Sequence, residues 1–132
     1  MTTPLSAAMR YVDVCTGSLS EQEFFFLLDD NVVLTHQTNG AKIDPIKGRA
    51  DVVEAFSKNI FKNTNKVDPK SVGFNIKDNS VAIFIDVKED KCLPDGSWVR
   101  FHFIERTLIT AVNFNKSWRI ASIEMNVTRE SA

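Results

Sequence analysis

The spacing of apolar residues in the first half of the chain predicts three helices. The first lies between Pro4, a residue favoured in a first helical turn, and Gly17, a typical helix stop. The second begins at Ser20, where Glu23 completes the pattern of a capping box, and residues 29–31 end its apolar stripe of Phe24, Leu27 and Leu28. The third opens at residues 48–51, and its apolar positions at helical spacing are Val52, Val53, Ala55, Phe56 and Ile60.

A period of two in the remaining segments predicts strands. Two short strands, 32–37 and 41–46, flank a turn at Thr38-Asn39-Gly40. After Pro69, alternating apolar residues mark four more strands, at 72–76, 81–87, 98–114 and 118–127. Segment 98–114 is much longer than the strand average of about 5–6 residues, so we expect it to be bent or bulged.

This order of elements predicts an α+β fold. Helices followed by a run of antiparallel strands favour three N-terminal helices packed on one face of a curved antiparallel sheet. No linker or repeat divides the chain, so we expect a single domain over residues 1–132. The sequence contains no GxGxxG or Walker-type phosphate loop, and nucleotide chemistry of those kinds has no support.

Charge and cysteine content narrow the class of protein. The chain has 16 Lys and Arg against 17 Asp and Glu, which argues against direct binding of nucleic acid by bulk phosphate neutralisation. Its apolar runs fall far short of the ~20 residues of a membrane span, and Arg10 and Asp13 interrupt the region where a signal peptide is apolar. Cys15 and Cys92 form neither a metal spacing nor a disulfide framework. We therefore expect an intracellular protein, cytoplasmic or nuclear and not secreted, with no membrane partner, metal or cofactor.

Three stretches of the sequence resemble the nuclear transport factor 2-like superfamily. They are Arg10-Tyr11-Val12 with the acidic Asp29-Asp30 downstream, the segment 48–56, and the closing segment 118–124. The order of elements is also similar over nearly the whole chain. The resemblance implies a cone-shaped fold that serves unrelated functions. These include small enzymes, such as ketosteroid isomerases and SnoaL-like polyketide cyclases, and non-catalytic transport and scaffold domains that dimerise through the sheet.

The isomerase branch implies a carboxylate base at the end of the first strand, with a tyrosine of the first helix and a protonated acid as hydrogen-bond donors. Tyr11 matches that tyrosine. Counting from Asp29-Asp30 puts Thr35 at the base position, and counting back from Trp118 puts Thr110 at the donor-acid position. Threonine has no useful pKa for either role, so this count disfavours isomerase-type chemistry.

A register shifted by one residue changes that conclusion. Strand alternation groups Val32, Leu34 and His36 on the more apolar face, which should point inward. His36 would then enter the cone, where an imidazole can act as a base near neutral pH. The alternative is a strand-end histidine at the rim, and the choice between Thr35 and His36 stays open at this point.

Glu105 is the remaining acid candidate. It shares the odd-numbered face of its strand with Val99, Phe101 and Phe103, so it is either a carboxyl at an apolar wall or turned to solvent by a bulge and paired with Arg106. The catalytic candidates are Tyr11, His36 and Glu105. The candidates that would line a pocket inside the cone are Tyr11, Thr35, His36, Phe56, Phe101, Phe103 and Thr110.

The last two predicted strands are similar to the end of the NTF2-like domains of the mRNA-export receptor and its small partner. In those domains the long hairpin implies a sheet surface that is buried against a second subunit. The even-numbered face of segment 98–114 mixes large apolar residues with arginine, as interfaces do. The interface candidates are Phe84, Trp98, Arg100, His102, Ile104, Arg106, Leu108, Trp118 and Ile120.

The missing acid pair and the closing hairpin favour a non-catalytic dimerising adaptor or transport-type domain. It would act through protein–protein interaction on its sheet face, as a homodimer or as a heterodimer with a related domain. The alternative is a small-molecule-binding protein or a cofactor-independent isomerase, cyclase or lyase. Such a protein would hold a small apolar ligand in a pocket inside the cone.

Overall fold

The computed structural model describes residues 3–15, 19–59, 64–67 and 72–130. In chain order the first elements are α1 (Pro4–Cys15), α2 (Glu21–Leu27), β1 (Leu28–Thr38), β2 (Ala41–Lys42), β3 (Ile46–Lys47) and α3 (Arg49–Asn59). The strands β4 (Thr64–Val67), β5 (Gly73–Lys77), β6 (Ser80–Cys92), β7 (Trp98–Phe114) and β8 (Ser117–Glu130) follow. The three predicted helices and the four predicted strands after Pro69 are confirmed. The strand β4 was not predicted, because it lies in a polar segment without an alternating pattern.

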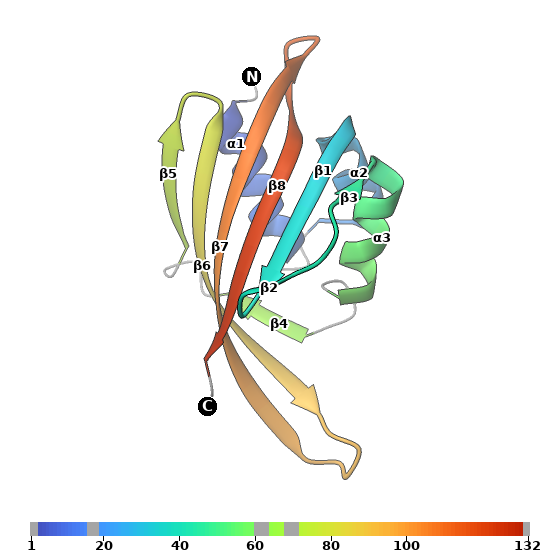
Figure 1. Ribbon diagram of the computed structural model, residues 1–132, viewed down its shortest axis with the longest axis vertical. Coiled ribbons are helices and arrows are strands. Elements are labelled where there is room, and N and C mark those ends of the chain that lie inside the picture. Colours follow the sequence, from blue (N-terminus) through green and yellow to red (C-terminus); the bar gives the residue numbers. More distant parts are fainter. Residues whose placement is uncertain (1–2, 16–18, 60–63, 68–71, 131–132) are drawn as a thin grey trace.

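The eight strands form one sheet with the order β2-β1-β8-β7-β6-β4, in which β3 also pairs with β1 and β5 with β6. The described pairs are antiparallel except for β1 and β8, which run parallel, so the sheet is mixed. Figure 1 shows α1 behind β6, β7 and β8, with α2 and α3 beside β1. We call the face that the helices cover the inner face and the opposite one the outer face. The expected α+β architecture is confirmed.

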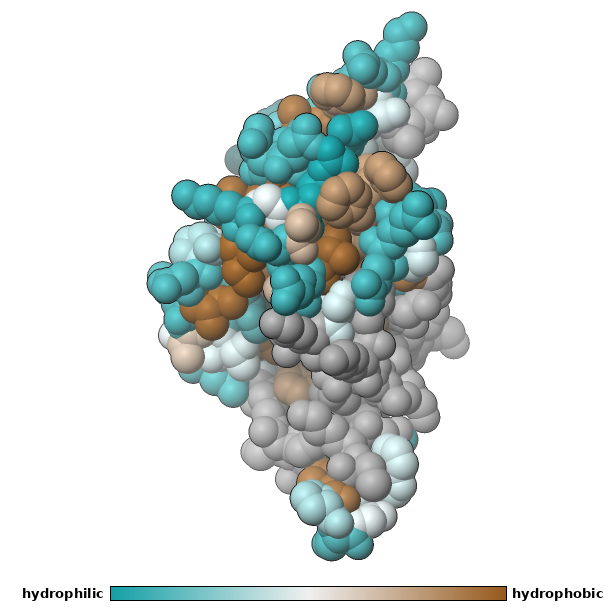
Figure 2. Space-filling model, turned by 90° about the vertical axis from the view of Figure 1, so that its right-hand side faces the viewer, coloured by the Kyte–Doolittle hydropathy of each residue, from teal (hydrophilic) through white to brown (hydrophobic). Residues whose placement is uncertain are grey.

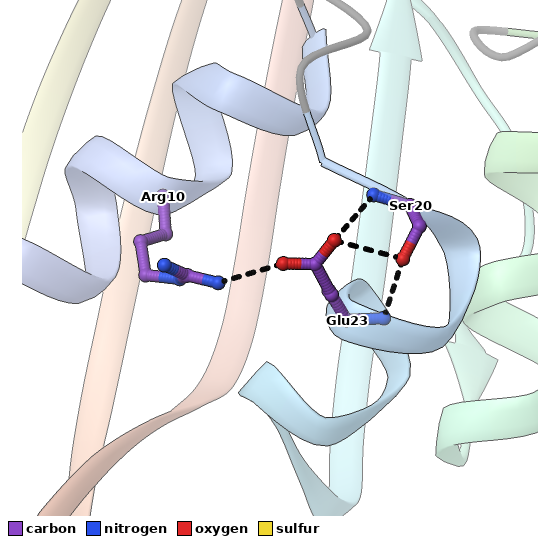
Figure 3. A network of polar contacts seen from close by, with 3 residues as sticks. All are labelled: Arg10, Ser20 and Glu23. Atoms are coloured by element: carbon purple, nitrogen blue, oxygen red, sulfur yellow. Dashed lines mark hydrogen bonds and ion pairs between the residues drawn. The ribbon is translucent and has the colours of Figure 1, made fainter.

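A surface network of Arg10, Ser20 and Glu23 links α1 to the beginning of α2 (Figure 3). Ser20 Oγ accepts a hydrogen bond of 3.1 Å from the backbone N–H of Glu23, and the Glu23 side chain accepts one from the Ser20 backbone N–H, which completes the predicted capping box. The guanidinium group of Arg10, on α1, lies 3.5 Å from the same carboxylate. Hydrogen bonds from Ser20 are the main reason that the pKa of Glu23 is lowered.

The end of α2 differs from the prediction. The helix pattern placed Leu28 on the apolar stripe and the stop at Asp29-Asp30-Asn31, but Leu28 already has extended backbone angles and begins β1. Leu28 is buried and stands opposite Ile120 of β8. Its apolar side chain therefore packs in the core from a strand position, and the acidic residues Asp29 and Asp30 also belong to β1.

Gly48 and the basic Arg49, which open the predicted third helix, stand at the start of α3. Gly48 has a φ of +91°, a region that favours glycine, and its N–H donates to the carbonyl of Val32. The next residue, Arg49, forms an ion pair with Asp30 of β1, and its guanidinium carbon lies 4.8 Å from the ring centre of Phe25. These contacts tie the beginning of α3 to both α2 and β1.

A bulge changes the alternation of β8. Thr110 of β7 stands opposite Ser122, but the next residue, Ala111, stands opposite Ile120, so Ala121 is an extra residue. Ile123 and Met125 face inward on one side of this bulge, and Ile120 faces inward on the other side. The sequence predicted a bend or bulge within segment 98–114, but the extra residue of this bulge lies on the neighbouring strand, β8.

This bulge corrects two of the interface candidates. Ile120 is 0% exposed and packs in the core, where it cannot contact a partner. Trp118 stands opposite Asn113, two residues from the buried Ala111, so it shares the inner side of β7 and is half-buried. In a strand without a bulge, strict alternation would have kept both residues on the outer face together with Ser122.

Candidate functional site

A polar cluster lies inside the core, between α1 and β7. Tyr11 comes from α1, and Glu105 and Thr107 are two residues apart on β7, so both face inward. The Tyr11 hydroxyl donates a hydrogen bond of 3.1 Å to Glu105 Oε2, and the Thr107 hydroxyl donates one of 2.8 Å to the same oxygen. Glu105 is only 6% exposed, and the bulge that would have turned it to solvent lies further along the hairpin.

Burial sets the protonation of this cluster. The pKa of Glu105 is raised because burial disfavours the charged carboxylate, and the hydrogen bonds from Thr107 and Tyr11 offset part of that effect. Burial is also the main reason that the pKa of Tyr11 is raised well above its ordinary value, and the charges of Cys15 and Glu105 raise it further. The phenol therefore stays a hydrogen-bond donor, and the carboxyl is biased toward its neutral form.

The two carboxyl oxygens of Glu105 have different surroundings. Both hydrogen bonds end on Oε2, and the described residues offer no partner to Oε1. A neutral carboxyl would carry its proton on Oε1, because Oε2 already accepts two bonds. That O–H group would be a buried donor that needs an acceptor.

Cys15 and Thr107 belong to this cluster but were not among the candidates. Cys15 is a buried free thiol one helical turn after Tyr11, and burial raises the pKa of Cys15 strongly. Thr107 shares the odd-numbered face of β7 with Glu105. Cys15 follows Tyr11 by four residues, the spacing of one helix face, and Thr107 follows Glu105 by two, the spacing of one strand face. These spacings could have identified both residues from the sequence.

Aromatic side chains close the cluster on the helix side. The Phe56 ring of α3 meets the Tyr11 ring edge to face, at 6.1 Å between centres, and lies 4.8 Å from the Phe24 ring of α2. Phe103 is partly buried against the same core. Of the other predicted pocket residues, Phe101 has a side chain that lies outside the described part of the structure.

His36 takes the inner position on β1. It stands opposite the buried Met125 of β8, which stands opposite Thr107, so all three side chains share one row across the inner face. The His36 Nε2 atom is 2.9 Å from the hydroxyl of Thr38, and half-burial lowers the pKa of His36. Of the two registers considered for this strand, β1 therefore has the one in which Val32, Leu34 and His36 share the inner face.

Two predicted pocket residues lie on the other face. Thr35 stands opposite the exposed Glu124, and Thr110 stands between Ser80 and Ser122 with its hydroxyl 3.5 Å from that of Ser80. Counting from fixed motifs placed both inside the cone, but the register of β1 and the alternation of β7 turn them outward. The pocket assignment of Thr35 and Thr110 is wrong for this reason.

The outer face carries most of the predicted interface residues. Phe84 of β6 is 46% exposed and stands opposite Arg106, whose guanidinium carbon lies 5.9 Å from the Phe84 ring centre. Leu108, one step along the same face of β7, is 37% exposed. His102 contacts Asp86 across the same pair of strands, with both side chains partly exposed. The remaining interface candidates on this face are Trp98 and Arg100, which are exposed, and Ile104, which is half-buried.

The side that carries α2 and α3 has a different surface. Figure 2 shows hydrophobic groups there that hydrophilic residues divide. Phe26 of α2 is exposed, and its ring packs edge to face against Phe25. Scattered exposure of this kind is common on protein surfaces.

Neither a metal cluster nor a membrane-spanning helix is found in the described part. No group of three or more His, Cys, Asp or Glu side chains among those residues is arranged to hold a metal ion. None of the described helices is long and apolar enough to cross a bilayer.

Comparisons with known proteins agree with this fold. A sequence model of the nuclear transport factor 2 (NTF2) domain matches residues 7–125. Comparison with curated protein sequences gave no match. Among solved structures, a SnoaL-like protein of the polyketide cyclase type from Shewanella putrefaciens CN-32 superimposes with a TM-score of 0.70 at 10% identity, over 96% of this chain and 80% of that one.

Two further structures have the same fold. The CaMKII hub of S. rosetta has a TM-score of 0.61 at 14% identity, over 93% of this chain and 92% of that one. An NTF2-like protein from Mesorhizobium loti has a TM-score of 0.62 at 14% identity, over 94% and 89% of the two chains. At these identities the likeness extends to the fold alone.

Proposed function

We propose that this chain, which belongs to the nuclear transport factor 2 (NTF2) domain family, is a non-catalytic adaptor domain that dimerises through the outer face of its sheet. The partner is a second copy or a related domain. An intracellular location, in the cytoplasm or the nucleus, is part of this proposal. Proteins with this fold include a CaMKII hub and a SnoaL-like protein, so the fold does not decide the function. The function has to be inferred from the residues of this chain.

The exposed apolar centre of the outer face is the observation that carries the proposal. Phe84 and Leu108 come from neighbouring strands, and Arg106 lies between them on the same face. No described helix covers these residues. Aromatic and aliphatic side chains interleaved with arginine are typical of the centre of protein interfaces.

The arrangement of the catalytic candidates inside the core also supports a non-catalytic role. The candidate acid Glu105 already accepts hydrogen bonds from Tyr11 and Thr107, which hold it inside the core. His36 is two strands away from Thr107 on the inner face, about 10 Å at the usual strand separation. Glu105 lies two residues along β7 from Thr107 and stands opposite Val127, so it is not in the row of His36, and no hydrogen bond joins these two side chains in the described part of the chain.

Sedimentation velocity at tens of micromolar tests the proposal. We expect the wild-type chain to sediment as a dimer and Leu108→Glu as a monomer, because a carboxylate would be buried without a partner. Ile43→Glu is the matched control, since Ile43 is exposed away from the outer-face centre and its replacement should leave the dimer intact. A wild-type chain that stays monomeric and recovers no related domain would contradict the proposal.

A second candidate function is the binding of a small molecule inside the cone. It is favoured by one observation, the Oε1 atom of Glu105, which lacks a partner among the described residues while the side chain is nearly fully buried. A neutral carboxyl there would suit an uncharged ligand with a hydrogen-bond acceptor.

Native mass spectrometry distinguishes the two functions. A ligand that co-purifies with the wild type and with Thr110→Val, but not with Glu105→Gln, would support the pocket. Thr110 is the control because it occupies the outer face of the same strand. The same bare mass for all three proteins would remove the support for this second function.

A further inference from the structure

Helix α1 is attached to the sheet through side chains. In the described part of the chain, none of the backbone hydrogen bonds outside the helices and strands joins α1 to a strand. The ion pair of Arg10 leads to Glu23 of α2, so it does not hold α1 against the sheet. The Tyr11 hydroxyl, by contrast, donates directly to Glu105 of β7. The state of this one carboxyl therefore acts on the attachment of the helix.

The strand β7 is held much more firmly than α1. It pairs with β6 on one side and with β8 on the other, and Glu105 itself stands between Ile85 and Val127. A movement of β7 would break main-chain hydrogen bonds to both neighbours, whereas a movement of α1 breaks only side-chain contacts. Local opening follows the least protected element. Of the two elements that the Tyr11 hydrogen bond joins, α1 is therefore the one that can separate.

The surroundings of Glu105 offer no positive charge in the described part of the chain. From β6 and β8 it is faced by the apolar side chains of Ile85 and Val127. From α1 it is faced by Tyr11 and Cys15, side chains that become negative when they lose a proton. The ion pairs found among the described residues do not include Glu105.

The other groups near the cluster do not change this balance. Phe56 of α3, which contacts the Tyr11 ring, is apolar. His36 stands in the row of Thr107 but on the far side of β8, and burial lowers the pKa of His36, so its positive charge is disfavoured. An ionised Glu105 would thus be a buried charge without a counter-charge, which is strongly destabilising. Burial accordingly raises the pKa of Glu105.

We propose that Glu105 is a pH-dependent switch for α1: the neutral carboxyl keeps the helix on the sheet, and loss of its proton to solvent releases α1 so that water reaches the carboxylate. The opening would uncover Cys15, a buried free thiol at the last residue of the same helix. The switch thus couples pH to the exposure of a thiol, with release on the alkaline side. It acts within one chain and does not depend on the outer face.

Labelling of the Cys15 thiol with dithiodipyridine tests the switch. Cys92→Ser makes Cys15 the only cysteine of the chain. At each pH the labelling rate of the folded protein is divided by the rate in urea, which cancels the ionisation of the thiol itself. We expect this ratio to rise by up to about tenfold for each pH unit above about 4.5, the ordinary pKa of a glutamate, until Glu105 is ionised in the folded protein as well.

Two variants in the same background separate the switch from simple destabilisation. Glu105→Gln keeps an oxygen that accepts both hydrogen bonds but has no proton to lose, so its ratio should not change with pH. Thr107→Val removes a hydrogen bond that favours the charged carboxyl, so the rise should continue to higher pH than in the wild type. Thr110→Val, on the outer face of the same strand, is the control and should follow the wild type.

The outcomes decide the proposal in either direction. The same rise in the wild type and in Glu105→Gln would overturn it. A rise that ends at the wild-type pH in Thr107→Val would also overturn it, and this variant gives a result even if Glu105→Gln does not fold. Hydrogen exchange at the same pH values locates the opening. Faster exchange in α1 with β7 and β8 still protected supports the release of α1, whereas equal increases in all three elements would mean global unfolding and refute it.

Discussion

The hydroxyl group of Tyr11 lies 3.1 Å from Oε2 of Glu105 and joins two residues that are 94 positions apart in the chain. The bond connects α1 to the middle of β7, at a place where both side chains are buried. It therefore fixes the helix against the sheet as well as satisfying a buried acid. Polar contacts of this kind contribute to one defined packing only if each buried group keeps its partner.

Tyr11→Phe should lower the free energy of unfolding by about 1–3 kcal/mol, because it removes a donor from a buried carboxyl without changing the ring. Thr107→Val should have an effect of similar size, since it removes the other donor to the same oxygen. Thr110→Val, on the outer face, is the control and should stay within about 0.5 kcal/mol of the wild type. Urea denaturation of the three variants measures these differences, and equal stabilities would contradict the role of the cluster.

Glu105 should make the protein less stable as the pH rises. The pKa of Glu105 is raised in the folded state, so the folded chain holds its proton more tightly than the unfolded chain does. The stability that comes from the neutral acid is complete below the unfolded pKa and is lost as the pH rises through the folded pKa. Glu105→Gln should remove this part of the pH dependence, which begins as the pH rises above about 4.5, the ordinary pKa of a glutamate; urea denaturation at a series of pH values follows it. An identical slope in both proteins would show that Glu105 does not titrate in this way.

His36 should have the opposite effect. Burial lowers the pKa of His36 in the folded state, so the unfolded chain binds the proton more readily. Stability should therefore fall as the pH decreases below about 6.5, the ordinary pKa of a histidine, and His36→Gln should reduce that fall. Comparing the single variants with the double variant His36→Gln, Glu105→Gln separates the two slopes. A loss of stability toward acid pH that is unchanged by His36→Gln would refute this prediction.

Replacing Ile120 tests the bulge in β8. Ile120→Ala should cost about 2–5 kcal/mol of stability, because the side chain is fully buried in the core. Leu108→Ala should cost much less in the monomer, since Leu108 lies on the outer face. Thermal or urea denaturation at protein concentrations below the dimer dissociation constant gives the comparison. Equal costs would mean that Ile120 faces outward, as an unbulged strand would place it.

Much of the fold could be predicted from neighbouring residues. The capping box of Ser20 and Glu23, the glycine before Arg49 and the alternation along β6 and β7 act within a few positions, and the structure contains each of them. The clustering of Tyr11 and Glu105 is compatible with those patterns, because helical spacing and strand alternation turn both side chains inward. Their catalytic or ligand-binding role stays a prediction.

The departures from prediction depend on contacts between distant segments. Leu28 leaves α2 because its burial against Ile120 belongs to the parallel pairing of β1 with β8, which no local period encodes. The extra residue Ala121 turns Ile120 inward, and it is visible only when β7 and β8 are aligned.

Local periodicity alone thus predicted the helices and the strands of the closing meander, and it grouped Glu105 with Val99, Phe101 and Phe103 on one side of β7. Packing of the whole chain decided the parallel pairing of β1 with β8, the inward position of His36 and the removal of Trp118 and Ile120 from the outer face. The physical reason is that alternation reports only which side chains share a side of one strand. The pairing of strands, which depends on the burial of residues up to a hundred positions apart, decides which side meets the helices.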